Sequence, residues 1–248
     1  MKSAELTPRG FKNDRRWMLV DENNQFITQR NITDMCFFDV LQGNNAFTIH
    51  HRKTSQKIEL SKEPAHGKEI TVTVWNDTVK AIAVSVELDD YFSSHLQQKC
   101  TLVEMPENTL RLVDKEYAFN NETVSFADAY PVLMLGEEAL KLLSKKTDKE
   151  MSALRFRPNL VFTGGTAHEE DNFGVFSVGE TQLRNAKLCG RCVMPTIEPS
   201  SGEIQKEVNT QLAQYRTIQN KIMFGINCLV NKTGNIHLGD TVQLLENI

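Results

Sequence analysis

Residues 188–203 spell LCGRCVMPTIEPSSGE, and this stretch is the most informative part of the chain. Cys189 and Cys192 form a C-x-x-C pair with Arg191 between them. A redox-active pair of this kind needs a helix N-terminus, which lowers the pKa of a thiol. Pro195 follows the pair at once, so a strand and a turn are favoured here, and thioredoxin-type chemistry is not.

Three other interpretations of the cysteine pair differ in what surrounds the sulfur atoms. A structural zinc site needs four ligands, usually from a second such pair or from nearby histidines, and the sequence has no second pair. Two core cysteines are a common arrangement, because free cysteine is among the most buried residue types, but Arg191 is a poor core residue. The pattern fits best a single soft thiolate offered to a metal that brings its other ligands with it.

A second informative segment is RFRPN at residues 155–159. Proline biases the preceding residue toward extended geometry, so we expect a strand on which Arg155, Arg157 and Asn159 share one face. Two guanidinium groups and an amide on one face form a grip for a phosphate. Surface arginines on a solvated strand edge are the alternative, and for this segment taken alone the commoner one. The basic pair Arg15-Arg16 is a third such element, with a solvated charge run as its default.

Short β-branched or apolar segments separated by turn residues predict a mainly β fold, a barrel or a sandwich. The clearest expected strands of the first half are residues 17–20, 37–41, 46–50, 70–75 and 79–86. Helices are expected at three places: a short one capped by Asp89-Asp90, one over residues 136–146, and one over residues 205–215. A domain boundary is expected near residues 105–125.

Composition excludes several classes of function. The 28 Lys and Arg residues against 32 Asp and Glu residues give a net charge of −4, and the scattered basic residues argue against a general nucleic-acid binder. No apolar run approaches the roughly 18 residues of a membrane span, and residues 1–16 contain no apolar core of a signal peptide. Five cysteines with only one close pair do not resemble a secreted disulfide framework, so we expect free thiols in a reducing cytoplasm.

From residue 155 onward the order of segments resembles the MOSC domain: FRPNLVFTGG, HEEDNF, VGETQL and LCGRCVMPTIEPSSGE, then LAQYR, FGIN and NIHLGDTVQLLE. Upstream, LTPRGFKNDRRWMLVDENNQFITQR is similar to the N-terminal β-barrel that precedes MOSC, and VSFADAYPVLMLGEEALKLL resembles the segment that joins the two. MOSC is the C-terminal module of molybdenum cofactor sulfurases and the core of the mitochondrial amidoxime-reducing component and of bacterial YcbX-type proteins. The resemblance implies a mainly β fold: a smaller N-terminal β-barrel at residues 1–115 and a β-barrel MOSC domain at residues 116–248, with a few short helices.

The same resemblance implies roles for individual residues. Cys192 matches the cysteine that ligates molybdenum, and is therefore the expected metal ligand and catalytic residue, while the pterin dithiolene supplies further sulfurs. Cofactor-binding roles are implied in the first hairpin, the joining segment, the RFRPN segment and the cysteine pair, at Arg15, Asp128, Tyr130, Arg157, Asn159, Gly190 and Arg191. The implied cofactor is the molybdenum cofactor, Mo-molybdopterin.

Two departures from the family pattern bear on cofactor binding. Members usually begin with a strand ending in Pro-[Ile/Val]-Lys-Ser, whereas this chain starts MKSAEL, so the first strand of the N-terminal barrel is expected to be missing. Gly190 stands where some relatives place a serine. No ferredoxin-like extension follows, and no cysteine after Cys228 is present for an iron–sulfur cluster. A separate ferredoxin- or flavoprotein-type reductase is therefore the expected electron donor.

Together these features favour a cytoplasmic molybdenum-dependent oxidoreductase that removes oxygen from small N-hydroxylated compounds. The cofactor performs the difficult step, and the protein supplies the thiolate, the orientation and the phosphate clamp. The alternative is a module that carries the cofactor or sulfur without turnover, which the short start and the missing electron-transfer domain favour. A family member that folds and binds nothing is the third option. No nucleic-acid partner and no membrane span are expected.

Overall fold

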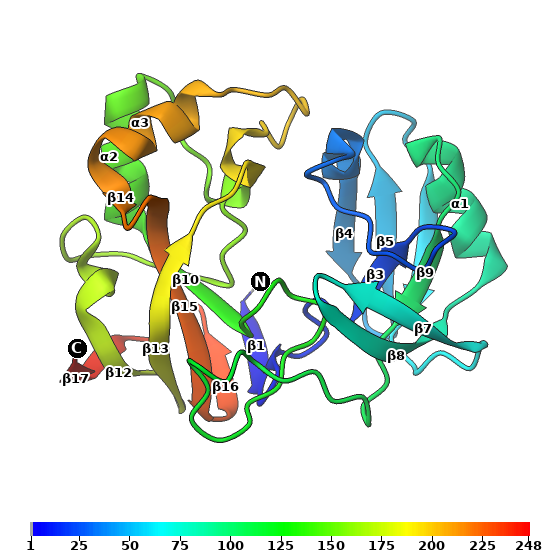
Figure 1. The fold of residues 1–248 in the computed structure, drawn as a ribbon, viewed down its shortest axis with the longest axis horizontal. Coiled ribbons are helices and arrows are strands. Elements are labelled where there is room, and N and C mark those ends of the chain that lie inside the picture. The colour runs from blue at the N-terminus through cyan, green and yellow to red at the C-terminus, as the bar shows by residue number, and fades with distance from the viewer. Residues whose placement is uncertain (1) are drawn as a thin grey trace. The chain divides into compact units, whose positions relative to one another are not determined.

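The computed structural model describes residues 2–248, which fold into two compact units (Figure 1). The C-terminal unit contains the residues up to 14, 112–198 and 204–248, and the N-terminal unit contains residues 15–111 and 199–203. Both units are discontinuous in sequence, whereas one boundary, between residues 115 and 116, was expected. The chain therefore enters the N-terminal unit twice.

The N-terminal unit consists of two antiparallel sheets and one helix, α1. One sheet has the strand order β3-β9-β8-β7 and the other the order β4-β5-β6. The strands are β3 (Trp17–Val20), β4 (Phe38–Gln42), β5 (Ala46–His51), β6 (Lys57–Ser61), β7 (Glu69–Val74), β8 (Asp77–Ala83) and β9 (Thr101–Glu104). The alternation predicted for residues 70–75 is confirmed in β7, where Val72 and Val74 are buried and Thr73 between them is only half-buried.

Helix α1 (Val86–Leu96) covers this core, and it begins earlier than the sequence predicted. Ser85, not Asp89-Asp90, caps the helix: its side chain accepts a hydrogen bond from the amide of Leu88 at 3.2 Å. Asp89 instead accepts a hydrogen bond from the amide of Leu102 on β9 at 2.7 Å. The predicted cap was wrong, because the Asp89 side chain accepts its hydrogen bond from β9 and not from the start of the helix.

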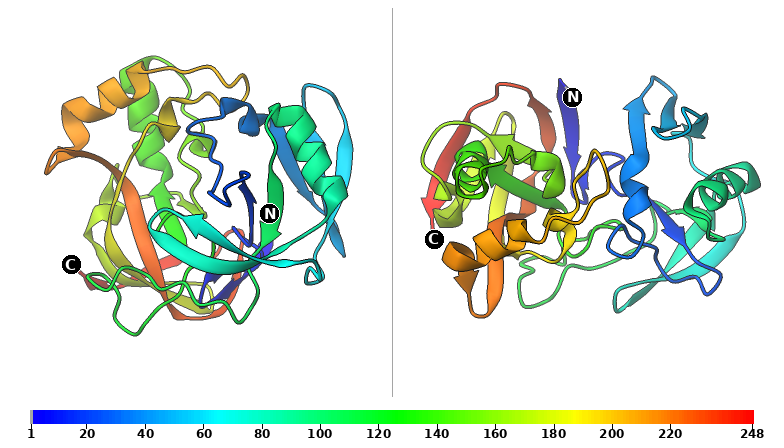
Figure 2. Two further views of the ribbon diagram at one scale, coloured as in Figure 1. Left: turned by 45° about the vertical axis from the view of Figure 1, so that its right-hand side comes forward. Right: turned by 90° about the horizontal axis from the view of Figure 1, so that it is seen from above.

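The C-terminal unit is organised around a curved sheet with the strand order β11-β10-β15-β13-β12-β17, and β14 pairs with β15 (Figure 2). Its strands are β10 (Val132–Gly136), β11 (Leu160–Phe162), β12 (Phe173–Val178), β13 (Thr181–Gly190), β14 (Thr217–Ile218), β15 (Lys221–Lys232) and β17 (Val242–Asn247). β10 and β11 are parallel, and the other neighbours are antiparallel. The core contains Met134, Phe176, Leu183 and Ile226, all fully buried.

Two helices of the C-terminal unit, α2 (Glu137–Thr147) and α3 (Glu207–Arg216), lie side by side at one end of this sheet (Figure 1). Leu140 and Leu143 of α2 and Leu212 of α3 share a core cluster with residues of β10 and β15. The two helices expected over residues 136–146 and 205–215 are thus confirmed, with ends that differ by one or two residues.

The start of the chain forms a strand of the C-terminal unit. β1 (Ser3–Thr7) lies between β16 (Gly234–His237) and β2 (Gly10–Phe11) in a three-stranded antiparallel sheet. Leu6 is 1% exposed and belongs to the main core of this unit. The stretch that begins LTPRGF at Leu6, which the resemblance assigned to the N-terminal barrel, therefore contributes to strands β1 and β2 of the other unit.

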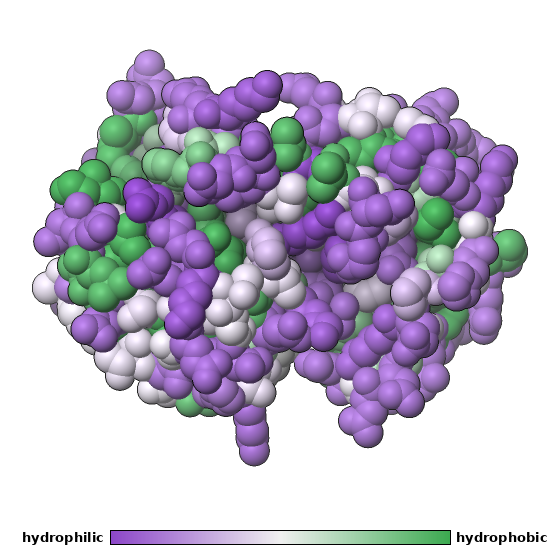
Figure 3. All heavy atoms as spheres, turned by 90° about the horizontal axis from the view of Figure 1, so that it is seen from below, coloured by the Kyte–Doolittle hydropathy of each residue, from purple (hydrophilic) through white to green (hydrophobic). Residues whose placement is uncertain are grey.

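The surface is predominantly hydrophilic on the face drawn in Figure 3, where hydrophobic residues appear in separate groups. Exposed apolar side chains nevertheless occur close in sequence to the candidate site, including Leu154 and Val193. Across residues 2–248, no helix has both the length and the apolar character needed to cross a membrane. The prediction that the fold is mainly β is confirmed, with three α-helices within the described residues.

Candidate functional site

Cys192 follows the end of β13, in a turn that bends away from the sheet. The register between β13 and β15 shifts at three places, the last of them between Leu188 and Gly190. Irregularities of this kind bend a strand and redirect the side chains that follow. A short 3-10 turn at Met194–Thr196 then closes the loop, so the predicted strand-and-turn setting of the cysteine pair is confirmed.

The Cys192 side chain is exposed, and two hydrogen bonds define the backbone around it. The amide of Met194 donates to Cys192 Sγ at 3.4 Å, and Asn209 Nδ2 on α3 donates to the carbonyl of Cys192 at 3.0 Å. Free cysteines are usually buried, so an exposed thiol held by its own turn calls for an explanation beyond packing. The other four cysteines are buried or half-buried, and none of the five forms a disulfide.

Arg191 connects the cysteine pair to the RFRPN segment. Its Nη1 donates to Cys189 Sγ at 3.0 Å, and its Nη2 donates to the carbonyl of Phe156 at 2.7 Å. Its guanidinium carbon also lies 5.2 Å from the centre of the Phe156 ring. This contact brings Cys192 and Arg157 together in the fold, because each is the immediate neighbour of one member of the Arg191–Phe156 pair.

The RFRPN segment is not the strand that the sequence predicted. Residues Ala153–Arg155 form a 3-10 turn, Arg157 has a φ of 54°, and β11 begins only at Leu160. Phe156 is 1% exposed and stacks on Phe224 at 4.4 Å, which pulls the segment inward. The prediction that Arg155, Arg157 and Asn159 share one face was therefore wrong, since period-two alternation applies only to extended backbone.

The members of the segment have different surroundings. Arg157 is exposed. Asn159 is half-buried, and its side chain accepts a hydrogen bond from the amide of Leu133 at 2.9 Å and donates to Asp14 at 2.8 Å. The Asn159 amide also donates to the carbonyl of Leu133 at 2.8 Å. Asn159 thus holds the segment against β10 and against the start of the chain.

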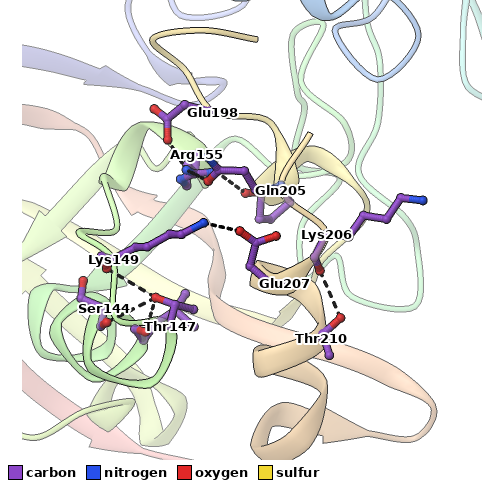
Figure 4. A network of polar contacts seen from close by, with 11 residues as sticks. Ser144, Thr147, Lys149, Arg155, Glu198, Gln205, Lys206, Glu207 and Thr210 are labelled. Carbon is purple, nitrogen blue, oxygen red and sulfur yellow. Dashed lines mark hydrogen bonds and ion pairs between the residues drawn. The ribbon is translucent and has the colours of Figure 1, made fainter. Parts of the chain in front are cut away.

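Arg155, the first residue of the segment, is 2% exposed and reaches the loop that begins at Cys192 (Figure 4). Its Nη1 donates to the carbonyl of Pro195 at 3.2 Å, and its Nη2 donates to Gln205 Oε1 at 2.6 Å. The same nitrogen forms an ion pair with Glu198, whose side chain is 25% exposed. Arg155 was expected to belong to the anion grip, whereas its guanidinium binds the protein's own carbonyl and carboxylate oxygens.

Two candidates lie in the segment that precedes β10. Asp128 is exposed, whereas Tyr130 is 7% exposed and its Oη has no hydrogen-bond partner within the described part of the chain. Burial raises the pKa of Tyr130, and the nearby Asp114 adds to this effect. Lys187 Nζ lies 5.3 Å from the centre of the Tyr130 ring, so the phenol faces the strand that leads to the cysteine pair.

Two remaining candidates differ in where they lie. Gly190, the last residue of β13, is exposed, and a Cβ atom added to it would meet only Lys221 Cδ and Met223 Sδ, at 3.8 and 3.9 Å. A serine would therefore be accommodated at this position. Arg15 belongs to the N-terminal unit, whereas the other candidates all belong to the C-terminal unit.

A cluster of buried and half-buried polar side chains around Glu170 was not anticipated from the sequence. Glu170 is fully buried; its Oε1 accepts the amide of Gly136, and burial raises its pKa. Asp171 forms an ion pair with Arg216 at 2.6 Å. Both ring nitrogens of His168 lack hydrogen-bond partners among residues 2–248, and burial, helped by the charge of Arg216, lowers the pKa of His168 to about 4. The local composition is that of a surface turn, so it gave no signal of burial.

A cavity of about 770 Å³ opens elsewhere on the C-terminal unit. It is lined by Phe119, Arg184 and several carboxamides, including Asn120 and Asn231. None of the candidate residues lines it, so the cavity and the candidate site are separate features.

The side chains of the C-terminal unit fit a metal group that brings most of its own ligands. Cys192 offers one exposed soft sulfur, which suits a thiophilic metal, and Arg157 offers an exposed guanidinium in the segment bonded to the cysteine pair. Across residues 2–248, no group of three or more His, Cys, Asp or Glu side chains could hold a metal ion. The buried, unpartnered phenol of Tyr130 adds a hydrogen-bonding group next to the strand that leads to the site.

Two family models match most of the chain. The model described as the MOSC N-terminal beta barrel domain matches residues 1–99, and the model described as the MOSC domain matches residues 121–243. The second match contains the RFRPN segment and both cysteines of the pair.

Individual proteins are similar over the same range. Mitochondrial amidoxime reducing component 2 of Homo sapiens is 25% identical over 259 residues, covering 98% of this chain and 77% of that protein. Mitochondrial amidoxime-reducing component 1 of Mus musculus is 25% identical over 264 residues, covering 99% of this chain and 77% of that protein. Molybdenum cofactor sulfurase of Solanum lycopersicum is 27% identical over 244 residues, covering 89% of this chain but only 30% of that protein.

Proposed function

This chain belongs to the MOSC family, with the N-terminal β-barrel domain ahead of the MOSC domain, and on that premise we propose that it is a molybdenum-cofactor reductase of N-hydroxylated compounds. The observation that carries the proposal is the exposed thiol of Cys192 beside the RFRPN segment, to which Arg191 joins it. The names of the amidoxime reducing relatives support the substrate class.

The proposed division of labour follows from the chemistry of the side chains. When bound, the cofactor supplies two-electron removal of an oxygen atom, so that R–NHOH, two electrons and two protons give R–NH₂ and water. Cys192 would ligate the molybdenum through Sγ. The exposed guanidinium of Arg157 would contact the phosphate or pterin, because a planar guanidinium forms paired hydrogen bonds with phosphate oxygens.

Other residues of the site would orient these two. Asn159 fixes the end of the RFRPN segment through its hydrogen bonds to Leu133 and Asp14. Asp128 and Tyr130 would contact the pterin from the segment that precedes β10, and Gly190 and Arg191 from the turn before Cys192. Arg15 belongs to the N-terminal unit, and its cofactor-binding role stays a prediction from the resemblance. The electrons would come from a separate ferredoxin- or flavoprotein-type reductase, and we place the protein in the cytoplasm.

Turnover separates this proposal from a cofactor carrier. The protein would be produced in a host that makes the molybdenum cofactor, then supplied with a reduced ferredoxin-type donor and a hydroxylamine or an amidoxime. We expect formation of the amine or amidine by the wild-type protein and by Lys149→Met, a surface control, and none by Cys192→Ser. Molybdenum-loaded wild-type protein that fails to reduce either substrate with any donor tested would favour the carrier.

A further inference from the structure

The loop from Val193 to Gln205 is held by a buried side chain from outside the loop, that of Arg155. Arg155, 2% exposed, contacts this loop at three points: the carbonyl of Pro195, and the side chains of Glu198 and Gln205, which Figure 4 shows. These partners lie 40, 43 and 50 residues away in the chain. A single planar guanidinium therefore ties both arms of the loop to the RFRPN segment.

The anchored arms are joined to Cys192 by short connections. The amide of Gln205 donates to the carbonyl of Thr196 at 2.7 Å, which closes the loop at its base. The amide of Thr196 donates to the carbonyl of Val193 at 3.0 Å, and the amide of Met194 donates to Cys192 Sγ. A displacement of Pro195 would therefore be transmitted through one turn to the sulfur of Cys192.

A second arginine makes the reverse connection. Arg191, from the cysteine pair, donates to the carbonyl of Phe156, and Arg155, from the RFRPN segment, donates to the carbonyl of Pro195. Each segment thus donates one guanidinium hydrogen bond to the other. The two positions linked, Arg191 and Pro195, lie on either side of Cys192 in the sequence. Two such links, directed oppositely, fix both the separation and the rotation of one segment against the other.

We propose that Arg155 is a positioning residue. Through its links to Pro195, Glu198 and Gln205 it fixes the position of the Cys192 thiol relative to Arg157. Its role toward the cofactor rests on the proposed function, but its role toward the thiol does not. The burial of Arg155 by the protein's own oxygens distinguishes it from Arg157, which is exposed. Arg155 acts through the turn and touches no ligand.

The test separates positioning from stability by means of a double variant. Arg155→Met/Glu198→Leu removes both charges together, and replacing a buried ion pair by apolar side chains is often neutral for stability. Arg155→Lys keeps the charge, but an ammonium group lacks the fork that reaches three acceptors. Lys149→Met is the matched control, because it breaks the neighbouring Lys149–Glu207 pair without touching the loop (Figure 4).

Two readouts are taken, hydrogen exchange at the Met194 amide and molybdenum per chain. We expect the double variant to unfold in urea close to the wild type, yet to exchange the Met194 amide at least tenfold faster and to retain several-fold less molybdenum. We expect Arg155→Lys to behave in the same way, and Lys149→Met to match the wild type. A stably folded double variant with the wild-type exchange rate would overturn the proposal.

The outcomes also distinguish this inference from the proposed function. Faster exchange at Met194 in a double variant that retains wild-type molybdenum would overturn the role of Arg155 toward the cofactor. A wild-type protein that binds no molybdenum would contradict the proposed function, whereas the exchange rates would still decide whether Arg155 positions the thiol.

Discussion

The buried and the exposed sides of the RFRPN segment differ sharply although they are two residues apart. Arg155 is enclosed and bonded to protein oxygens on the loop after Cys192, whereas Arg157 is exposed in the segment that Arg191 bonds to the cysteine pair. One arginine of the segment thus holds the protein's own loop, and the other presents its guanidinium at the surface. The fixed geometry of this site therefore comes from its inner face, whereas the proposed contacts with the cofactor would come from its outer face.

The largest expected effect on stability comes from breaking the inner face alone. Arg155→Met leaves the carboxylate of Glu198 without its cation, and removing one partner of a buried pair costs about 3–5 kcal/mol. Since the Glu198 side chain is 25% exposed, we expect the lower end, about 3 kcal/mol, in urea unfolding. A loss below about 1 kcal/mol, as for an exposed pair, would show that the Arg155–Glu198 pair does not stabilise the fold as a buried pair does.

A smaller, pH-dependent effect is expected from His168, another interior group of the C-terminal unit. Its pKa in the folded protein is about 4, below the usual 6.5, so the unfolded chain binds a proton first as the solution is acidified. The contribution of neutral His168 to the free energy of unfolding is therefore fully present above about pH 6.5 and is lost as the pH falls toward 4. Allowing for solvent screening of a half-buried ring, we expect a loss of about 1 kcal/mol at pH 5.

His168→Asn isolates this contribution. Asparagine accepts the left-handed backbone found at this position, where φ is 67°, and it does not titrate. Urea unfolding of both proteins at pH 7.5 and pH 5 gives the difference. An unchanged pH dependence in the variant would mean that His168 is not held neutral by its surroundings.

The smallest effect on stability is expected on the outer face. Arg157→Asn removes the guanidinium and keeps a residue that tolerates the φ of 54°, so the free energy of unfolding should change by less than about 0.5 kcal/mol. Molybdenum content should nevertheless fall several-fold, measured on protein from a cofactor-competent host. A large loss of stability with normal molybdenum would exchange the roles of the two faces.

Much of the fold could be predicted from local pattern. The strand over residues 17–20 and the alternating strand over residues 70–75 are present, and the helix over residues 136–146 forms with acidic residues in its first turn and lysines in its last. In each case the residues that decide the element are neighbours in sequence. The strand-and-turn setting of the C-x-x-C pair was likewise predicted correctly, because Pro195 argued against a helix: Cys189 lies near the end of β13 and Cys192 in the turn that follows.

The arrangement of the site was harder to predict, because it depends on contacts between distant residues. The strand predicted for residues 155–159 fails since Phe156 packs on Phe224 and Arg155 binds Glu198, and neither partner is visible from the local sequence. Glu170 looks like a surface acid until the amide of Gly136, 34 residues earlier, is found against it. The spacing of apolar residues predicts helices and strands, but it does not predict which distant residues a side chain will contact.

The most direct test of the central claim is the molybdenum content of the wild-type protein and of Cys192→Ala, both purified from a host that makes the cofactor. Cys192 is exposed and alanine removes one long hydrogen bond, from the Met194 amide at 3.4 Å, so the two proteins should unfold at similar urea concentrations. We expect close to one molybdenum per wild-type chain and almost none in the variant. Equal molybdenum in the two proteins would contradict the assignment of Cys192 as the metal ligand.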